Sequence, residues 1–357
     1  MAEEEARSAK AGGVVMSGNM RSWICAAAAA AVVVPVLAAG PVEIKLATFA
    51  PANSKWHLEL TDLADTWKKV TEGRVTLTVY PGGNQGTEES VIKKMNPVAG
   101  QLQAALLLEP GLAEIDQAFN VFAIPFFFES DAEYRSIQQA LTPILTARLE
   151  QKKFHLVNWG HAGWIQIFSK KPIRSLAELK AAKLFTSEGD TRMVQWYKAN
   201  GFNPQALPFN DIAAQLRLPT GLIDTAPSPP YGALVLRYFE NAPYMLDVSV
   251  APLVGATIVT DDAWKRISDA DRTKMLAAAR GMEDRVLGGA PKLDADSIAA
   301  MEKRGLKVQK LTPAAAAEFR AAADTLTATM RGGMVPADVF DAAMAARTAF
   351  RKTKKPS

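Results

Sequence analysis

The stretch from residue 180 to residue 230 constrains the fold most, because short extended segments and short helices alternate along it. Residues 183–186 are expected to form a strand. A helix should follow from Gly189, since the apolar residues after it recur at the spacing of one helical face. Asn200 and Gly201 should end that helix, because both residue types tolerate the left-handed backbone conformation of a helix C-terminus.

The same alternation continues beyond that helix. A second extended piece is expected at 207–209, then a helix at 211–218 with Asn210 as its N-cap, and then a third extended piece at 220–224. These connections are too short for anything but parallel or mixed strand pairing. The pattern therefore predicts an α/β fold built around an open sheet.

Hydrophobic periodicity places elements in the rest of the chain as well. A helix should begin after Asn53 or Ser54. The helix at 131–152 should be broken by Pro143. The other expected strands are 42–47, 75–80, 102–108, 155–159, 164–168 and 253–260, and the other expected helices are 87–95, 268–305 and 313–352, the last interrupted near Pro336.

The N-terminal segment is typical of a secretory signal peptide. Arg21 precedes a short apolar run at 24–37, and small residues follow it, which suits cleavage near Ala38 or Ala39. An anchor that is never cleaved is the alternative. Cys25 is the only cysteine and lies inside this segment. The mature chain would then contain neither a disulfide nor a cysteine-based catalytic or metal site.

Several motifs follow one another in a defined order. They are Trp-His at 56–57, Tyr-Pro-Gly-Gly at 80–83, Ile-Pro-Phe-Phe-Phe at 124–128, Ser-Lys-Lys-Pro-Ile at 169–173, Pro-Phe at 208–209 and Thr-Gly-Leu-Ile-Asp at 220–224. This order resembles the solute receptors of TRAP transporters, the tripartite ATP-independent periplasmic systems. Each motif is weak by itself, but the joint order, which covers about residues 42–310, is specific.

The resemblance implies a two-lobe periplasmic-binding-protein fold of type II-like α/β architecture, with long C-terminal helices bracing both lobes. Residues 1–39 would be an N-terminal extension and signal peptide. Lobe 1 would comprise 40–157 plus 250–305, lobe 2 would comprise 158–249, and 306–357 would form a helical segment. The chain would cross between the lobes near Asn158 and Pro252.

No catalytic or cofactor-binding motif is present. The chain lacks nucleophile-elbow, phosphate-loop and His-Glu-x-x-His patterns, and its three histidines are scattered. His161 lies between glycine-containing segments near the expected crossing, where a structural role is favoured over ligand contact. The net charge of +4 is spread along the sequence without a basic platform, which gives no support for nucleic-acid binding.

Aromatic and polar residues at expected strand ends and turns are the candidate ligand contacts. Open α/β sheets bind ligands outside the carboxyl ends of their strands, although any one of these side chains would also suit a core. The candidates are Trp56, Glu109, Phe126, Phe127, Trp159, Trp164, Phe185, Ser187, Ser228 and Tyr231.

Two candidates depart from the pattern of the family. Phe185 stands where the receptors have a carboxylate-binding Arg, and Ser228 stands where they have Asn. Trp164 stands at a second position where many relatives carry an Arg. An anion would lack a partner there, so an apolar or amphipathic ligand is expected. Cations that would change this expectation if they reached the cleft are Arg174, Arg192 and Arg217.

The sequence thus favours a monomeric, periplasmic solute receptor without a cofactor. It would bind a small molecule between two lobes and deliver it to TRAP-type membrane permease subunits. Two alternatives remain, an exported enzyme on the same scaffold and a ligand sensor that signals to a membrane partner.

Overall fold

A computed structural model describes residues 40–353 of the protein. The expected signal peptide and its cleavage site lie outside the described residues. Within 40–353, no helix is both long and apolar enough to cross a membrane.

The first sheet has the strand order β2–β1–β3–β10–β4. Strand β1 is parallel to β2 and β3, whereas β10 is antiparallel to both β3 and β4. The sheet is thus mixed. The strands are β1 (Val42–Thr48), β2 (Val75–Tyr80), β3 (Ala104–Leu108), β4 (Phe154–Trp164) and β10 (Pro252–Thr260).

Alternation along β3 gives this sheet two apolar faces. Ala104 and Leu106 join the cluster formed with helices α1 (Lys55–Val70) and α10 (Asp269–Glu302), whereas Ala105 and Leu107 join the cluster formed with α4 (Asp131–Gln151). Helix α1 begins as expected, because Ser54 accepts a hydrogen bond from the amide of His57.

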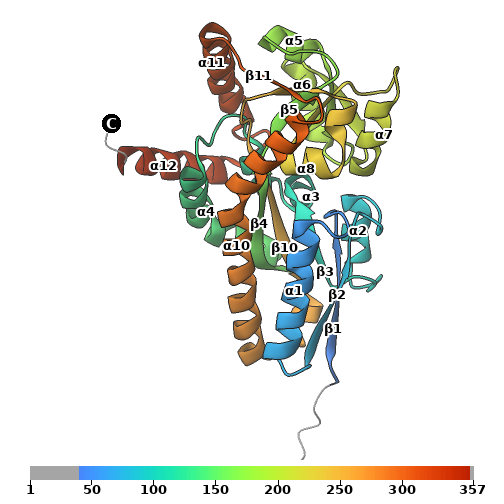
Figure 1. The fold of residues 1–357 in the computed structure, drawn as a ribbon. Coiled ribbons are helices and arrows are strands. Elements are labelled where there is room, and N and C mark those ends of the chain that lie inside the picture. Colours follow the sequence, from blue (N-terminus) through green and yellow to red (C-terminus); the bar gives the residue numbers. More distant parts are fainter. Residues whose placement is uncertain (1–39, 354–357) are drawn as a thin grey trace, which may run out of the picture. The chain divides into compact units, whose positions relative to one another are not determined.

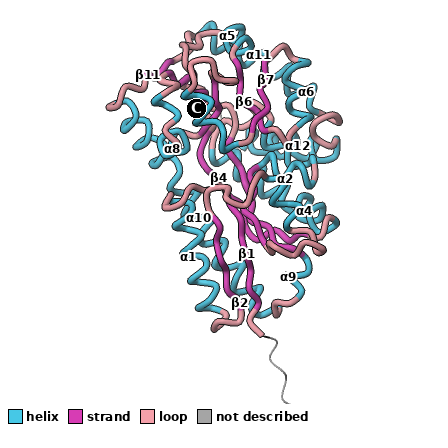
Figure 2. The backbone as a smooth tube through the Cα atoms, turned by 90° about the vertical axis from the view of Figure 1, so that its right-hand side faces the viewer, coloured by secondary structure: helices cyan, strands magenta, loops and turns pink. Residues whose placement is uncertain are grey.

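The second sheet has the order β11–β9–β5–β8–β6–β7. Strand β6 is parallel to β7 and β8, which confirms the mixed pairing expected from the short connections. Figure 2 shows the two sheets as separate groups of strands, with β1 and β2 in one and β6 and β7 in the other. The strands are β5 (Gln166–Ser169), β6 (Lys183–Ser187), β7 (Asn203–Leu207), β8 (Thr225–Ser228), β9 (Tyr244–Leu246) and β11 (Lys307–Gln309).

Short helices complete both lobes. They are α2 (Glu88–Lys94), α3 (Glu109–Ile115), η1 (Gln117–Ala123), α5 (Leu176–Ala181), α6 (Thr191–Ala199), η2 (Phe209–Asp211), α7 (Ile212–Arg217), α8 (Pro230–Val235), η3 (Tyr238–Glu240) and α9 (Asp261–Lys265).

Strand positions between 200 and 228 differ from those expected. Strand β7 ends at Leu207, and the expected extended piece after it is the 3-10 turn η2. Asn210 lies inside that turn beside Gly83 and is not an N-cap. The third strand is β8 and not 220–224, because Gly221 closes a turn by donating to the carbonyl of Leu218.

Strand β4 is also longer than expected. It pairs with β10 from Phe154 to Trp164, so the expected break at 160–163 is wrong. Gly163 accommodates the local bend with a φ of 104°. The chain therefore leaves the first sheet after Trp164 and not near Asn158, while the lobe boundaries as compact units stay a prediction.

The two segments that join the lobes are hydrogen-bonded to each other. The Ile165 amide donates to the Ala251 carbonyl at 2.9 Å, and the Val250 amide donates to the Ile165 carbonyl at 2.9 Å. These two segments are short and paired, as hinge segments are, and α10 is a further connection because it leads from the first lobe to β11 of the second sheet.

Helix α4 continues through Pro143, so the expected break there is also wrong. A mid-helix proline costs about 3 kcal/mol. Leu141 and Leu145 on either side of it are fully buried in the first lobe. Tertiary packing of this apolar face outweighs the lost hydrogen bond.

Three long helices in the C-terminal part of the chain pack on the lobes, and α10 packs on both. Helix α10 packs on α1 and β4 of the first lobe and on α8 of the second (Figure 1). Helix α11 (Pro313–Met330) packs on α5, and α12 (Ala337–Thr353) packs on α4. The expected interruption near Pro336 is present between these last two helices.

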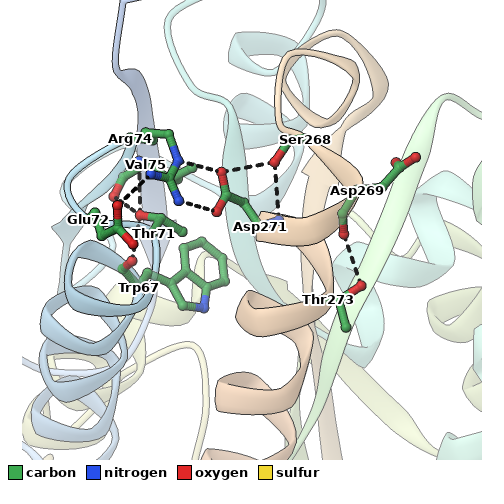
Figure 3. Close-up of polar contacts among 9 residues, drawn as sticks. All are labelled: Trp67, Thr71, Glu72, Arg74, Val75, Ser268, Asp269, Asp271 and Thr273. Carbon is green, nitrogen blue, oxygen red and sulfur yellow. Dashed lines mark hydrogen bonds and ion pairs between the residues drawn. The ribbon is translucent and has the colours of Figure 1, made fainter.

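An ion pair fixes the start of α10 (Figure 3). Arg74 donates from Nε and Nη2 to the two carboxylate oxygens of Asp271, each at 2.9 Å. Ser268 caps the same helix by accepting from the Asp271 amide at 3.2 Å. The pair joins the loop before β2 to α10, elements that are far apart in the sequence.

Candidate ligand-binding site

A cavity of about 300 Å³ lies between the two lobes. Trp56 and Glu109 line it from the first lobe, and Phe185 and Ser187 line it from the second. The hinge residue Ile165 also contributes to the lining. The cavity thus has the size of a small organic molecule and the position expected of a two-lobe receptor.

Seven of the ten candidate residues line this cavity. Phe185 and Ser187 belong to the end of β6, Ser228 ends β8, and Glu109 directly follows β3. The carboxyl ends of strands therefore supply the site, as the rule for open sheets predicts. The seven are Trp56, Glu109, Phe126, Trp159, Phe185, Ser187 and Ser228.

The other three candidates lie outside the lining. Phe127 is buried in the core of the first lobe. The indole of Trp164 donates to Asp131 Oδ1 at 2.8 Å. The Tyr231 hydroxyl accepts from the Lys55 amide at 2.9 Å, and its ring packs edge-on against Trp56. Tyr231 thus supports a lining residue without reaching the cavity itself.

Among the described residues, four carboxyl groups line the cavity; three of them come from the starts of different helices, and the fourth is Glu283 inside α10. Glu88 begins α2, Glu109 begins α3, and Asp190 is the N-cap of α6, where it accepts from the Met193 amide at 2.9 Å. All three lie in the lining. Asp190 comes from the second lobe and the two glutamates from the first, so the acids face one another across the cleft.

Burial raises the pKa of each of these acids. Desolvation and the nearby charges of Asp190 and Glu88 raise the pKa of Glu109 well above its usual range. Burial raises the pKa of Glu88 to about 8, although its Oε1 accepts from the Leu108 amide at 2.8 Å. Burial also raises the pKa of Asp190. At neutral pH the Glu88 carboxyl group therefore largely holds its proton.

Polar atoms without partners mark other parts of the wall. Among the described residues, Asn158 Oδ1, Thr186 Oγ1 and both ring nitrogens of His161 are buried and lack hydrogen bonds. Burial lowers the pKa of His161 to about 4, so its imidazole is neutral at pH 7. Unpartnered buried groups are rare in proteins, and in a cavity wall they are available to a ligand.

Sequence reasoning missed Glu88, Asp190, Asn158 and Thr186, and it favoured a structural role for His161, which lines the cavity. Asp190 was visible only as the residue that opens a helix. Its place in the cavity wall could not be predicted from the sequence, because only the tertiary fold brings the starts of α2, α3 and α6 to one cavity.

No arginine or lysine of residues 40–353 lines the cavity. Arg192 instead donates to Gln117 Oε1, and Arg174 and Arg217 also lie outside the lining. In the same part of the chain, no group of three or more His, Cys, Asp or Glu is arranged to hold a metal ion. The site combines aromatic walls and carboxyl groups without a built-in cation.

Comparison with known families matches residues 46–332 to the bacterial extracellular solute-binding proteins of family 7. Among curated proteins, the sialic acid-binding periplasmic protein SiaP of Vibrio cholerae is 18% identical over 267 residues, which are 74% of this chain and 82% of that protein.

Solved structures share the fold. A TRAP periplasmic solute-binding protein from Desulfovibrio salexigens with bound orotic acid has a TM-score of 0.79 at 16% identity, covering 88% of this chain and 100% of that one. DctP7 of Bordetella pertussis, an extracytoplasmic solute receptor binding pyroglutamic acid, has a TM-score of 0.77 at 20% identity, covering 86% and 99%. These likenesses confirm the two-lobe α/β fold class.

The family is one of binding proteins, and its members are periplasmic. The match covers most of the chain, including both sheets and the cavity between them. The protein therefore belongs to family 7 of the bacterial extracellular solute-binding proteins, the TRAP periplasmic solute-binding proteins.

Proposed function

We propose that this receptor is exported to the periplasm, captures a small organic ligand with an apolar or amphipathic body between its lobes, and delivers it to a TRAP-type permease. The observation that carries the proposal is the cavity wall. Trp56, Phe126 and Phe185 line it, and neither Arg nor Lys of residues 40–353 does. Aromatic surfaces favour apolar or cationic groups, whereas an unpaired carboxylate would lose its hydration without compensation.

The proposed ligand differs from those of the similar receptors. Orotic acid and pyroglutamic acid are bound by two of them, and succinate by a receptor from Sulfurospirillum deleyianum that is 20% identical, covers 86% of this chain and 100% of its own, and has a TM-score of 0.77. In this chain Phe185 lines the cavity at the position where the resemblance implies a carboxylate-binding Arg. The fold is shared with these receptors, but the residue at this position of the cavity wall differs. This difference supports a ligand of another chemical class.

Capture would work by closure of the lobes about the hinge. Ile165 on one crossing segment exchanges hydrogen bonds with residues of the other, and it also lines the cavity. A ligand that contacts both lobes stabilises the closed state by its differential affinity for that state. We propose binding without chemistry, and the permease as the partner that receives the ligand.

Two measurements test this function. Mass spectrometry of protein purified from the periplasm without refolding should identify a retained small molecule with an apolar body. Isothermal titration calorimetry should detect no binding of succinate or pyruvate. Micromolar binding of either acid would contradict the proposed ligand class.

Export is tested separately. N-terminal sequencing of the protein purified from the periplasm should give Ala39 or Gly40 as the first residue.

A further inference from the structure

Glu109 is a buried acid in the cavity wall, and one of its carboxyl oxygens has no hydrogen-bond partner among the described residues. Its residue is 8% exposed, and within residues 40–353 its Oε1 has no hydrogen-bond partner. Its backbone is fixed, because it follows β3 directly and begins α3. The carboxyl group therefore faces the ligand space from a rigid support.

Other acids surround Glu109 from both lobes. Asp190, at the start of α6, and Glu88, at the start of α2, both act on Glu109 electrostatically. Tyr197 on α6 lies close enough to be affected by both Asp190 and Glu109. The nearest cation described for Asp190 is Arg192, which donates to Gln117 and does not line the cavity. Carboxyl groups of both lobes thus face each other across the cleft, and no Arg or Lys of residues 40–353 lines the space between them.

A second feature of the wall is independent of the acids. Thr186 lies on β6, directly after Phe185, and its residue is 5% exposed. Among the described residues, its hydroxyl oxygen has no partner although it belongs to the cavity lining. The oxygen can accept a hydrogen bond from an N–H group. A ligand with several N–H donors would satisfy both it and the acids.

The geometry points to a protonated amine as part of the ligand. We propose that Glu109, Glu88 and Asp190 form an acidic pole that binds the ammonium group of an amphipathic amine, while the aromatic walls hold its apolar body. This inference rests on the proposed function as a solute receptor. One cation would then draw carboxylates of both lobes together, which couples its binding to closure.

Binding would release a proton. In the empty receptor burial raises the pKa of Glu109, which has Glu88, Asp190 and Tyr197 as neighbouring groups, and raises the pKa of Glu88 to about 8; both shifts favour the protonated carboxyl. An ammonium ion stabilises the carboxylate form, so the carboxyl proton passes to solvent. A neutral ligand that only donates hydrogen bonds would not cause this release.

The first experiment uses matched probes in a thermal-shift screen confirmed by calorimetry. The probes of one set share an apolar group and differ in their polar group, which is an amine, an alcohol or a carboxylate. One such set is 2-phenylethylamine, 2-phenylethanol and 3-phenylpropionate. Hits should come from the amines. Hits among alcohols or carboxylates without amines would overturn the acidic pole while leaving the receptor function intact. A screen without hits in any form would contradict the receptor function itself.

The second experiment removes the charge. For an amine that binds, Glu109→Gln should weaken affinity by roughly ten- to a hundredfold and reduce proton release, measured by calorimetry in buffers of different ionisation enthalpy. Asp190→Asn, which retains the helix cap, should weaken it in the same direction. Glu89→Gln is the matched control, because Glu89 pairs with Lys93 outside the cavity. Unchanged affinity in both cavity variants would overturn the proposal.

Discussion

Acidic residues in two regions of the molecule have opposite environments. At the start of α10, Asp271 accepts two hydrogen bonds from Arg74, and these bonds lower the pKa of Asp271 to about 2 (Figure 3). In the cavity, Glu109 has no cation beside it, and burial raises its pKa well above the usual range. Both residues are little exposed, but only Asp271 has a cation that offsets the loss of hydration.

The difference lies in where the partner comes from. Asp271 receives its cation from the loop before β2, and the fold itself completes the pair. Glu109 receives none from residues 40–353, and its pKa is raised because burial removes the hydration of the charged form. A group that the fold leaves without a partner costs stability. That cost is consistent with a role in ligand binding.

The largest expected effect concerns the pH dependence of stability at Glu88. Its folded pKa of about 8 exceeds the usual 4.5, so its contribution is full below pH 4.5 and is lost as pH rises toward 8. Glu88→Gln removes this loss and should raise the free energy of unfolding relative to wild type by about 2–4 kcal/mol at pH 8, with little difference at pH 4.5.

Urea unfolding between pH 4.5 and 8.5 measures this effect. Glu89→Gln is the control, because Glu89 is exposed and pairs with Lys93. A difference that stays constant with pH would contradict the raised pKa of Glu88.

The opposite sign is expected at the start of α10. Asp271→Asn loses the charge-assisted bonds to Arg74 and should lower the free energy of unfolding by about 1–3 kcal/mol at pH 7. The folded pKa of Asp271 is lowered to about 2, so its contribution is present above the usual 3.8 and is lost as pH falls toward 2. The stabilities of variant and wild type should therefore approach each other as pH falls from about 4 to 2. If Asp271→Asn stabilised the protein, the ion pair with Arg74 would not stabilise the start of α10, and the two acids would not differ in the way described.

A cation can also be placed in the cavity. Phe185→Arg would add a guanidinium group to a wall that contains Glu109 and Asp190, and it would compete with a ligand ammonium for them. Affinity for an amine probe should fall by about tenfold or more. Phe185→Leu, which removes only the aromatic face, should weaken binding by about two- to fivefold. Tighter amine binding in the Arg variant, measured by calorimetry, would contradict the acidic pole.

Local pattern predicted most strands and the start of α1, because apolar alternation and a cap such as Ser54 act over a few positions. It misplaced β8 and the end of β4, where a turn at Gly221 and continuous pairing with β10 decide the outcome. It also located part of the aromatic wall, namely Trp56, Phe126, Trp159 and Phe185, but not the other aromatic residues that line the cavity. The acidic pole was not visible, because Glu88 and Asp190 each resemble an ordinary residue of a helix start.

Trp159 and Trp164 also show that sequence alone does not tell which side chains line the cavity, and their positions on one strand allow a direct comparison. Both are on β4 and both donate one indole hydrogen bond, Trp159 to Thr142 and Trp164 to Asp131. Only Trp159 lines the cavity. The sequence made them equal candidates, because whether a strand residue faces a cavity depends on the elements packed against it.

Replacing each tryptophan by phenylalanine separates their roles. Either change loses one hydrogen bond and should lower the free energy of unfolding by about 0.5–1.5 kcal/mol. Trp159→Phe should also alter affinity for a bound probe, because the indole ring forms part of the wall, whereas Trp164→Phe should leave affinity within about twofold because its indole is held by Asp131 away from the ligand space. Urea unfolding and calorimetry on the two variants measure both quantities. A larger loss of affinity in Trp164→Phe than in Trp159→Phe would place the ligand on the Asp131 side of β4. The residues assigned to the cavity wall would then be wrong.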